Sequence, residues 1–224
     1  ISILLDHRKK NCSLKTSVNS INKKFNNIED LNSKIFEEIL SVIEINKSSN
    51  LVLSGGNSPR HLFKMIAQHK KYFKEATFLM SDERIVNIDD LNSNEGEFIR
   101  LSNISRDNLI SLHDERIAQK LKNFTTYDIA ILGMGEDGHF ASIFPNCSNT
   151  SKALNSHNNI VIFQDEHLNF SRVTLSLNEI LKAKKIILIA SSKNKQSILK
   201  HESGLPIHYL LKRSSNKLSI FNCD

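Results

Sequence analysis

The chain has 224 residues, 39% of them hydrophobic, and its 30 lysines and arginines outnumber 24 acidic residues to give a formal net charge of +6. This length allows a substantial buried core and favours a single domain over residues 1–224. No run approaches the roughly 20 apolar residues that cross a bilayer, and residues 1–27 are too polar for a secretory signal. Cys12, Cys147 and Cys223 are widely spaced, so neither a disulfide framework nor a zinc cluster is predicted. We therefore expect a cytoplasmic protein without a membrane partner.

The positive charge is concentrated at the two ends of the chain. Residues 1–27 carry six basic residues against one acidic residue, and residues 182–224 carry nine against two. Few aromatic residues are interleaved with these charges, and no nucleic-acid recognition motif accompanies them. We therefore expect no nucleic-acid partner and interpret residues 1–27 as a basic segment that forms a peripheral strand or loop.

The hydrophobic pattern predicts alternating helices and strands. A helix is expected over 28–45, a short buried strand at 51–53, a helix over 61–72, and strands at 76–80 and 128–132. Further strands are expected at 160–163, 172–175 and 185–190, with helices at 177–183 and 193–201. Several of these strands are apolar throughout, which is typical of strands covered on both faces. The predicted fold class is α/β, with a mostly parallel, Rossmann-like sheet and helices on both faces.

Four of the predicted strands end in polar or glycine-rich loops. Because parallel strands present their carboxyl ends at one edge of the sheet, where ligands bind in such folds, we expect these loops to meet there. The loops comprise Ser54 to Arg60, Ser81 to Arg84, Leu132 to Pro145, and Ser191 to Lys195.

The loop after the strand 128–132 places a lone histidine, His139, beside Asp137 and among glycines that include Gly138. Glycines let backbone N–H groups approach a ligand closely, and the residues after His139, including Ser142, are expected to start a helix. His139 is therefore a candidate general base, although a structural histidine bonded to the backbone is the alternative.

The spacing Gly133-x-Gly135-x-x-Gly138 also matches a dinucleotide-binding fingerprint. Glu136 and Asp137 would place negative charge against a pyrophosphate, and no acidic residue follows at the usual separation. We therefore favour a different ligand.

A second candidate site is the turn Gly55-Gly56-Asn57-Ser58, whose N–H groups open a helix and can bind a phosphate. The alternative is an ordinary tight turn without a ligand, which would need the same glycines for its backbone conformation. Arg84 and Lys195, expected at the same sheet edge, would add positive charge, although Arg84 could instead pair with Asp82 or Glu83 and Lys195 could be solvated. No metal-ligand spacing and no Gly-x-Ser-x-Gly elbow is found. The residues thus predict a site for a phosphorylated metabolite with proton-transfer chemistry and no metal.

Over about residues 28–200 the chain resembles the 6-phosphogluconolactonases, in the superfamily shared with glucosamine-6-phosphate deaminase. The resemblance is carried by four motifs: Ser54-Gly-Gly-Asn-Ser-Pro59, Asp82-Glu-Arg-Ile-Val86 with Ser93-Asn94, Gly133 to Pro145, and Arg172-Val-Thr174. The deaminase pattern has tyrosine at the position of Arg84 and continues toward Asn-Glu-Pro where this chain has Ala-Ser-Ile-Phe-Pro, so the lactonase is favoured.

The resemblance implies hydrolysis of 6-phospho-D-glucono-1,5-lactone in the oxidative pentose phosphate pathway, without metal or cofactor, by a monomer or small homo-oligomer. His139 would be the general base, supported by Asp137. The phosphate would be held by Gly55, Gly56, Asn57, Ser58, Arg84 and Lys195, with Gly138 in the same loop as the base and Arg172 as a weaker candidate. Asp82 and Asn94 would bond the sugar hydroxyls.

Some positions differ from the family pattern. Asn57 and Ser58 replace a commoner Ser/Thr-Thr pair, Asn87 stands where proline is usual, Phe140 replaces threonine, and Ser192 replaces a glycine. A serine at 192 would fit poorly if that turn required a positive φ. The deaminase and a non-catalytic sugar-phosphate sensor remain as alternative functions; retention of His139 argues against the sensor.

Overall fold

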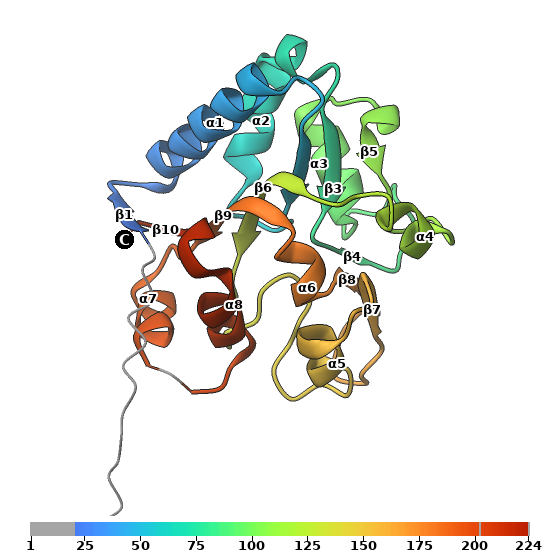
Figure 1. The fold of residues 1–224 in the computed structure, drawn as a ribbon, viewed down its shortest axis with the longest axis vertical. Helices are drawn as coiled ribbons and strands as arrows, with labels where there is room; N and C mark the ends of the chain where they lie inside the picture. Colours follow the sequence, from blue (N-terminus) through green and yellow to red (C-terminus); the bar gives the residue numbers. More distant parts are fainter. Residues whose placement is uncertain (1–20, 202, 224) are drawn as a thin grey trace, which may run out of the picture.

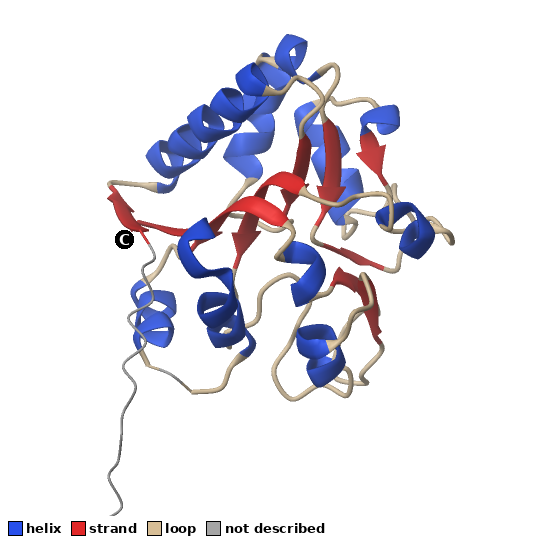
Figure 2. Cartoon of the chain, in the orientation of Figure 1, coloured by secondary structure: helices blue, strands red, loops and turns tan. Residues whose placement is uncertain are grey.

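The computed structural model describes residues 21–201 and 203–223, in which strands and helices alternate (Figures 1 and 2). The strands are β1 (Ile21–Phe25), β2 (Asn50–Leu53), β3 (Thr77–Met80), β4 (Asp82–Arg84), β5 (Leu109–Ile110), β6 (Tyr127–Gly133), β7 (Ile160–Phe163), β8 (Arg172–Leu175), β9 (Ala183–Ile189) and β10 (Leu218–Cys223). The α-helices are α1 (Ile28–Ile45), α2 (Arg60–Gln68), α3 (Asn94–Ser102), α4 (Ile117–Leu121), α5 (Thr150–Asn155), α6 (Leu177–Ile180), α7 (Lys193–Lys200) and α8 (Pro206–Ser214). Three 3-10 turns add to them: η1 (Lys70–Phe73), η2 (Arg106–Asn108) and η3 (Ser215–Lys217).

Seven strands form one parallel sheet in the order β1-β10-β9-β6-β2-β3-β5. Helices α1, α2 and α3 lie on one side of it, and α6 and α8 lie on the other (Figure 1). The first six residues of the central strand β6 are buried, as the apolar run from Ile129 to Leu132 predicts for a strand covered on both faces. The predicted α/β fold is therefore confirmed.

Helix α1 shows how the local sequence produces these elements. The Asn27 side chain accepts the N–H of Asp30 at 2.7 Å and so caps the first turn. Leu31, Ile35 and Ile39 recur every four residues on one face and are fully buried. The helix predicted over 28–45 is confirmed with those bounds.

The predicted strands at 160–163 and 172–175 form, but they do not join the parallel sheet. They pair with β4 in a separate antiparallel sheet of order β4-β8-β7, in which Arg84 lies opposite Arg172. Residues 82–84, expected as part of a loop, are therefore the strand that connects this small sheet to the end of β3. Apolar pattern alone predicts a strand but does not say which sheet it joins.

The prediction of a helix directly after His139 is wrong. Residues 134–149 form turns and isolated bridges, and the next helix, α5, begins at Thr150. Ala141 and Asn146 have φ values of 48° and 60°, a left-handed backbone that cannot continue a right-handed helix. Ser142 is consequently a buried loop residue, and the glycine spacing of this loop lacks the helix of a dinucleotide fingerprint.

The two ends of the described chain lie together. Strand β1 is an edge strand that pairs in parallel with β10, so residues 21–25 form the peripheral strand expected of the basic segment, whereas residues 1–20 lie outside the described part. Among the described residues, no helix combines the length and apolar character that a membrane crossing requires. Cys147 and Cys223 are buried, while Cys12 lies outside the described part.

Candidate active site

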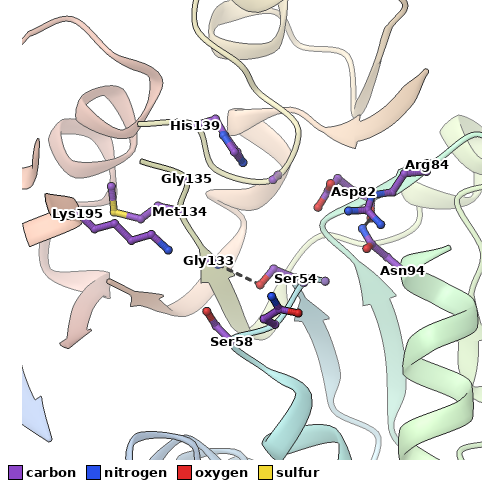
Figure 3. A pocket seen from close by; sticks show the side chains of 14 residues that line it. Ser54, Ser58, Asp82, Arg84, Asn94, Gly133, Met134, Gly135, His139 and Lys195 are labelled. Atoms are coloured by element: carbon purple, nitrogen blue, oxygen red, sulfur yellow. Dashed lines mark hydrogen bonds between the residues drawn. The ribbon is translucent and has the colours of Figure 1, made fainter. Parts of the chain in front are cut away.

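A cavity of about 320 Å³ opens at the carboxyl ends of β2, β3 and β6 (Figure 3). The side chains and turns around it come from all four loops that the sequence placed at this edge. It is lined by Ser54, Gly55, Gly56, Asn57, Ser58, Asp82, Arg84, Asn94, Gly133, Met134, Gly135, His139, Ala141 and Lys195. Nine of the twelve predicted site residues are thus brought together.

The turn after β2 forms one wall. The backbone N–H groups of Gly55, Gly56, Asn57 and Ser58 donate to no acceptor within the described residues. A turn with unused donors before a helix is suited to binding an anion. Gly55 is required by packing, because a Cβ there would lie 2.2 Å from Oδ1 of Asn94.

Asp82, Arg84 and Asn94 form the opposite wall (Figure 3). The buried Asp82 carboxylate accepts the hydroxyls of Ser81 at 2.9 Å and Ser142 at 2.6 Å. The Arg84 guanidinium donates to the carbonyl of Asn92 at 2.6 Å and forms no ion pair with any described residue, so the alternative of a salt bridge to Asp82 or Glu83 does not hold. Its remaining N–H groups are available to a ligand.

His139 lies across the cavity and is oriented by Asp137. Its Nδ1 is 2.6 Å from Oδ1 of Asp137, and its ring packs against Phe144 with centroids 4.7 Å apart. Burial raises the pKa of the Asp137 carboxyl, but the hydrogen bond and charge of His139 outweigh it and hold that pKa below its ordinary value. An ionised carboxylate can only accept, so the Nδ1 atom carries the hydrogen and Nε2 is left as the acceptor.

Two glycines allow this arrangement. A Cβ at Gly135 would lie 2.3 Å from the His139 ring, so only glycine leaves room for the imidazole to fold back over the loop. Gly138 has a φ of 80°, and its carbonyl accepts the N–H of Ile207 at 3.0 Å, which ties the loop to α8.

Lys195 reaches the cavity from the first turn of α7. Ser192 caps this helix, because its hydroxyl accepts the N–H of Lys195 at 3.2 Å. Ser192 has a φ of −172°, an extended backbone that any residue adopts. Serine therefore serves this turn well, and the Lys195 ammonium forms no ion pair within the described part of the chain.

Asp137, Gly138 and Arg172 do not line the cavity. Asp137 and Gly138 contact it only through the His139 loop. Arg172 is opposite Arg84 in the small sheet, donates to the Phe170 carbonyl at 2.8 Å and lies over the Phe170 ring. Burial and the nearby positive charge of Arg84 lower the pKa of Arg172 from the ordinary value, so the two guanidinium groups repel one another.

Met134, Ala141 and Ser142 were not predicted as site residues. Met134 and Ala141 line the cavity, and Ser142 holds the Asp82 carboxylate from 60 positions along the chain. The loop motif around His139 contains all three residues, but only the folded structure shows that Ser142 contacts Asp82. A fully buried residue, Glu83, was likewise missed, although it lies between Asp82 and Arg84.

The fold and cavity define a class: an α/β protein with a carboxylate-held histidine and a turn of unused N–H donors, at the sheet edge where such proteins bind ligands. The family model for glucosamine-6-phosphate isomerases/6-phosphogluconolactonase matches residues 23–218. The chain belongs to this family. The resemblance inferred from the motifs is confirmed, and the chain is an enzyme of sugar-phosphate metabolism.

Individual relatives belong to the same family. A 6-phosphogluconolactonase from Haemophilus influenzae is 30% identical over 196 residues, which are 79% of this chain and 83% of the relative. The crystal structure of a 6-phosphogluconolactonase from Shewanella baltica matches with a TM-score of 0.82 and 26% identity, covering 92% of this chain and 98% of that chain. A monomeric glucosamine-6-phosphate deaminase shares the fold, with a TM-score of 0.73 at 18% identity over 91% of this chain and 97% of that chain. The fold alone therefore does not separate the two activities.

Proposed function

We propose that the chain hydrolyses 6-phospho-D-glucono-1,5-lactone to 6-phospho-D-gluconate. The observation that carries this proposal is the pair His139 and Asp137, with 2.6 Å between Nδ1 and Oδ1, facing a cavity that also offers Arg84, Lys195 and the unused N–H groups of residues 55–58. A base at one side and anion-binding groups at the other suit a substrate with a reactive ester and a phosphate.

His139 is the proposed general base. With its Nδ1 hydrogen held by Asp137, the neutral imidazole accepts a proton at Nε2 from a water molecule that attacks the lactone carbonyl carbon. The tetrahedral intermediate then collapses, the bond from the carbonyl carbon to the ring oxygen breaks, and the imidazolium returns the proton to that oxygen. Backbone N–H groups of the surrounding loops stabilise the negative oxygen that forms in between.

The remaining polar residues bind the substrate. Arg84, Lys195 and the amides of residues 55–58 hold the phosphate, with Arg172 adding positive charge from behind Arg84. Asp82 and Asn94 bond the sugar hydroxyls. Binding energy from the phosphate, far from the reacting carbon, thereby fixes the ester beside His139.

Two assays on the same preparation test this proposal. Freshly generated lactone should be hydrolysed well above its spontaneous rate, while glucosamine 6-phosphate should release no ammonia. Ammonia release without lactone hydrolysis would instead support the deaminase, for which the shared fold is the only structural argument. Binding of 6-phosphogluconate by a well-folded protein with neither activity would point to the sensor.

A further inference from the structure

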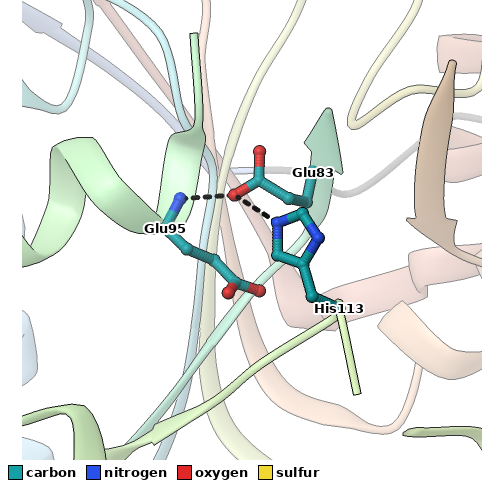
Figure 4. Close-up of side chains that lie close together, drawn as sticks. All are labelled: Glu83, Glu95 and His113. Atoms are coloured by element: carbon teal, nitrogen blue, oxygen red, sulfur yellow. Dashed lines mark hydrogen bonds and ion pairs between the residues drawn. The ribbon is translucent and has the colours of Figure 1, made fainter. Parts of the chain in front are cut away.

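Three titratable side chains form a cluster (Figure 4), two of which are the sequence neighbours of Arg84 and Asn94 in the cavity wall. Glu83 comes from β4, Glu95 from the first turn of α3, and His113 from the segment after β5. Their nearest carboxylate and imidazole atoms all lie within 4.8 Å of one another. None of the three lines the cavity, and the proposed chemistry uses none of them.

The Glu83 carboxylate joins the two segments that supply Arg84 and Asn94. It accepts the N–H of Arg84 at 2.6 Å, the N–H of Asn94 at 2.8 Å and the N–H of Glu95 at 2.6 Å, in addition to the hydroxyl of Ser93 at 2.9 Å. The side chain is fully buried. One carboxylate thus fixes the distance between strand β4 and the start of α3.

Glu95 places a second carboxylate in the same buried space. Its oxygens accept the hydroxyl of Ser111 and the N–H of Leu112, both at 2.6 Å, and its side chain is also fully buried. Two buried carboxylates this close repel one another unless a proton or a cation lies between them. Both Glu83 oxygens already accept two protein donors each, so a metal ion bound there would have to displace one of them, whereas each Glu95 oxygen accepts only one.

His113 is the group placed to supply that positive charge. Its Nε2 is a buried atom with no hydrogen bond to any described residue, and it lies 3.8 Å from Oε2 of Glu83 (Figure 4). Interaction with Glu83, assisted by the charge of Glu95, raises the pKa of His113 above its ordinary value despite burial. Burial and the neighbouring Glu83 raise the pKa of Glu95, whereas the donors around Glu83 keep its pKa low.

Other charges near the cluster do not replace His113. Arg84 and Asp82 flank Glu83 on β4. Arg172 on β8 is close enough that the negative charge of Glu83 acts to raise its pKa. Asp114, next to His113 in the chain, is paired with Lys120 of α4. We propose that His113 is a positioning residue: by neutralising the buried Glu83–Glu95 pair, it keeps Arg84 and Asn94 in the geometry that binds the phosphorylated substrate.

This proposal rests on the proposed function for its kinetic test. The variant His113→Gln removes the cation and keeps a polar side chain, and His157→Gln, at an exposed histidine, is the matched control. We expect His113→Gln to raise KM for the lactone roughly tenfold, the equivalent of about one pKa unit of lost interaction, with kcat within about twofold. The defect should grow as the pH rises and Glu95 ionises.

The double variant His113→Gln/Glu95→Gln supplies the rescue. With one carboxylate removed, no cation is needed, so KM should return close to that of Glu95→Gln alone and lose its pH dependence. A generic loss of packing at position 113 would not be repaired by a change at 95. Parent-like KM in His113→Gln over the whole pH range, or no recovery in the double variant, would overturn the proposal.

Binding of inorganic phosphate keeps the proposal testable if His113→Gln does not fold or if the parent hydrolyses no lactone. The affinity of the parent for phosphate, measured by calorimetry, should fall as the His113 imidazole, followed by NMR, loses its proton, whereas Glu95→Gln should show no such fall. Identical profiles for the two proteins would refute the role of His113. A parent without lactonase activity would refute the proposed function and leave this comparison intact.

Discussion

At the scale of single residues, the central feature is a histidine whose tautomer is set by a neighbour two positions away. Asp137 contacts the cavity only through His139, and its carboxylate accepts from both the ring Nδ1 and the backbone N–H of His139. Because the two residues lie in one glycine-rich turn, the orientation of the imidazole depends directly on the backbone geometry of that turn.

Asp137→Asn tests that dependence. The amide cannot act as a charged acceptor, and the lost charge-assisted hydrogen bond should lower kcat roughly 10- to 100-fold, the kinetic equivalent of about 1.5–3 kcal/mol. KM should change little, because Asp137 does not line the cavity. Steady-state kinetics of lactone hydrolysis provide the measurement. Glu136→Gln, at the exposed neighbouring acid, is the control, and an equal loss in both variants would mean that only the local charge matters.

At the scale of elements, the site depends on close contact between two loops. Gly55 after β2 packs against the Asn94 side chain at the start of α3, and the Asn94 amide donates to the Asp82 carbonyl at 2.9 Å. The two walls of the cavity are therefore held in register by contacts that leave no space for a methyl group.

Gly55→Ala should accordingly separate the two walls. We expect a rise in KM for the lactone of about tenfold or more and a loss of about 1–3 kcal/mol in the free energy of unfolding, as for other overpacked positions. Gly204→Ala is the control: it has a φ of 71° and open space around a new Cβ, so it should cost stability through backbone strain alone and leave KM unchanged. Unchanged KM in Gly55→Ala would show that Asn94 can move without consequence.

The elements also show what sequence patterns can predict. Apolar residues at helical spacing located α1, and short apolar runs located β2, β3, β6 and β9, because both patterns reflect which side chains are buried. The same patterns did not reveal that β7 and β8 leave the main sheet, since pairing partners depend on long-range register. The prediction of a helix after His139 was wrong because Ala141 and Asn146 adopt left-handed backbones, for which alanine gives no local signal and asparagine only a weak one.

The site was predicted to a similar extent. Residues in specific loop motifs, such as His139 and Arg84, were found because parallel strands bring their following loops to one edge. Ser142, Glu83 and His113 were missed because their roles arise from contacts between segments far apart in sequence. Such buried polar contacts leave no periodic pattern to detect.

At the scale of the whole molecule, one carboxylate ties the first long helix to the sheet. Glu38 of α1 pairs with Lys23 of β1 at 3.3 Å and with Lys185 of β9. Burial alone would raise the pKa of Glu38, but these two lysines outweigh it and hold that pKa below its ordinary value. A lowered pKa in the folded state means that the ionised carboxylate stabilises the fold above its unfolded-state pKa, and that this stability is lost as pH falls through the folded-state pKa.

Glu38→Gln should therefore lower the free energy of unfolding by about 1 kcal/mol at pH 7, a modest value because both lysines are partly exposed. The difference from the parent should shrink toward zero as the pH falls below about 4, where the parent carboxyl is protonated as well. Denaturant unfolding at several pH values provides the measurement. Glu37→Gln, which removes a more exposed partner of Lys34, should have a smaller effect, and a Glu38→Gln deficit that persists undiminished at low pH would contradict the linkage.

Hydrolysis of freshly generated 6-phosphogluconolactone by the parent and by His139→Ala, with the spontaneous rate subtracted, tests whether His139 is the general base. We expect His139→Ala to lose about 10²- to 10⁴-fold in kcat, as for removal of a general base, while its melting temperature and its affinity for 6-phosphogluconate stay close to those of the parent. Near-normal turnover in a well-folded His139→Ala would contradict the account and remove this histidine from the mechanism.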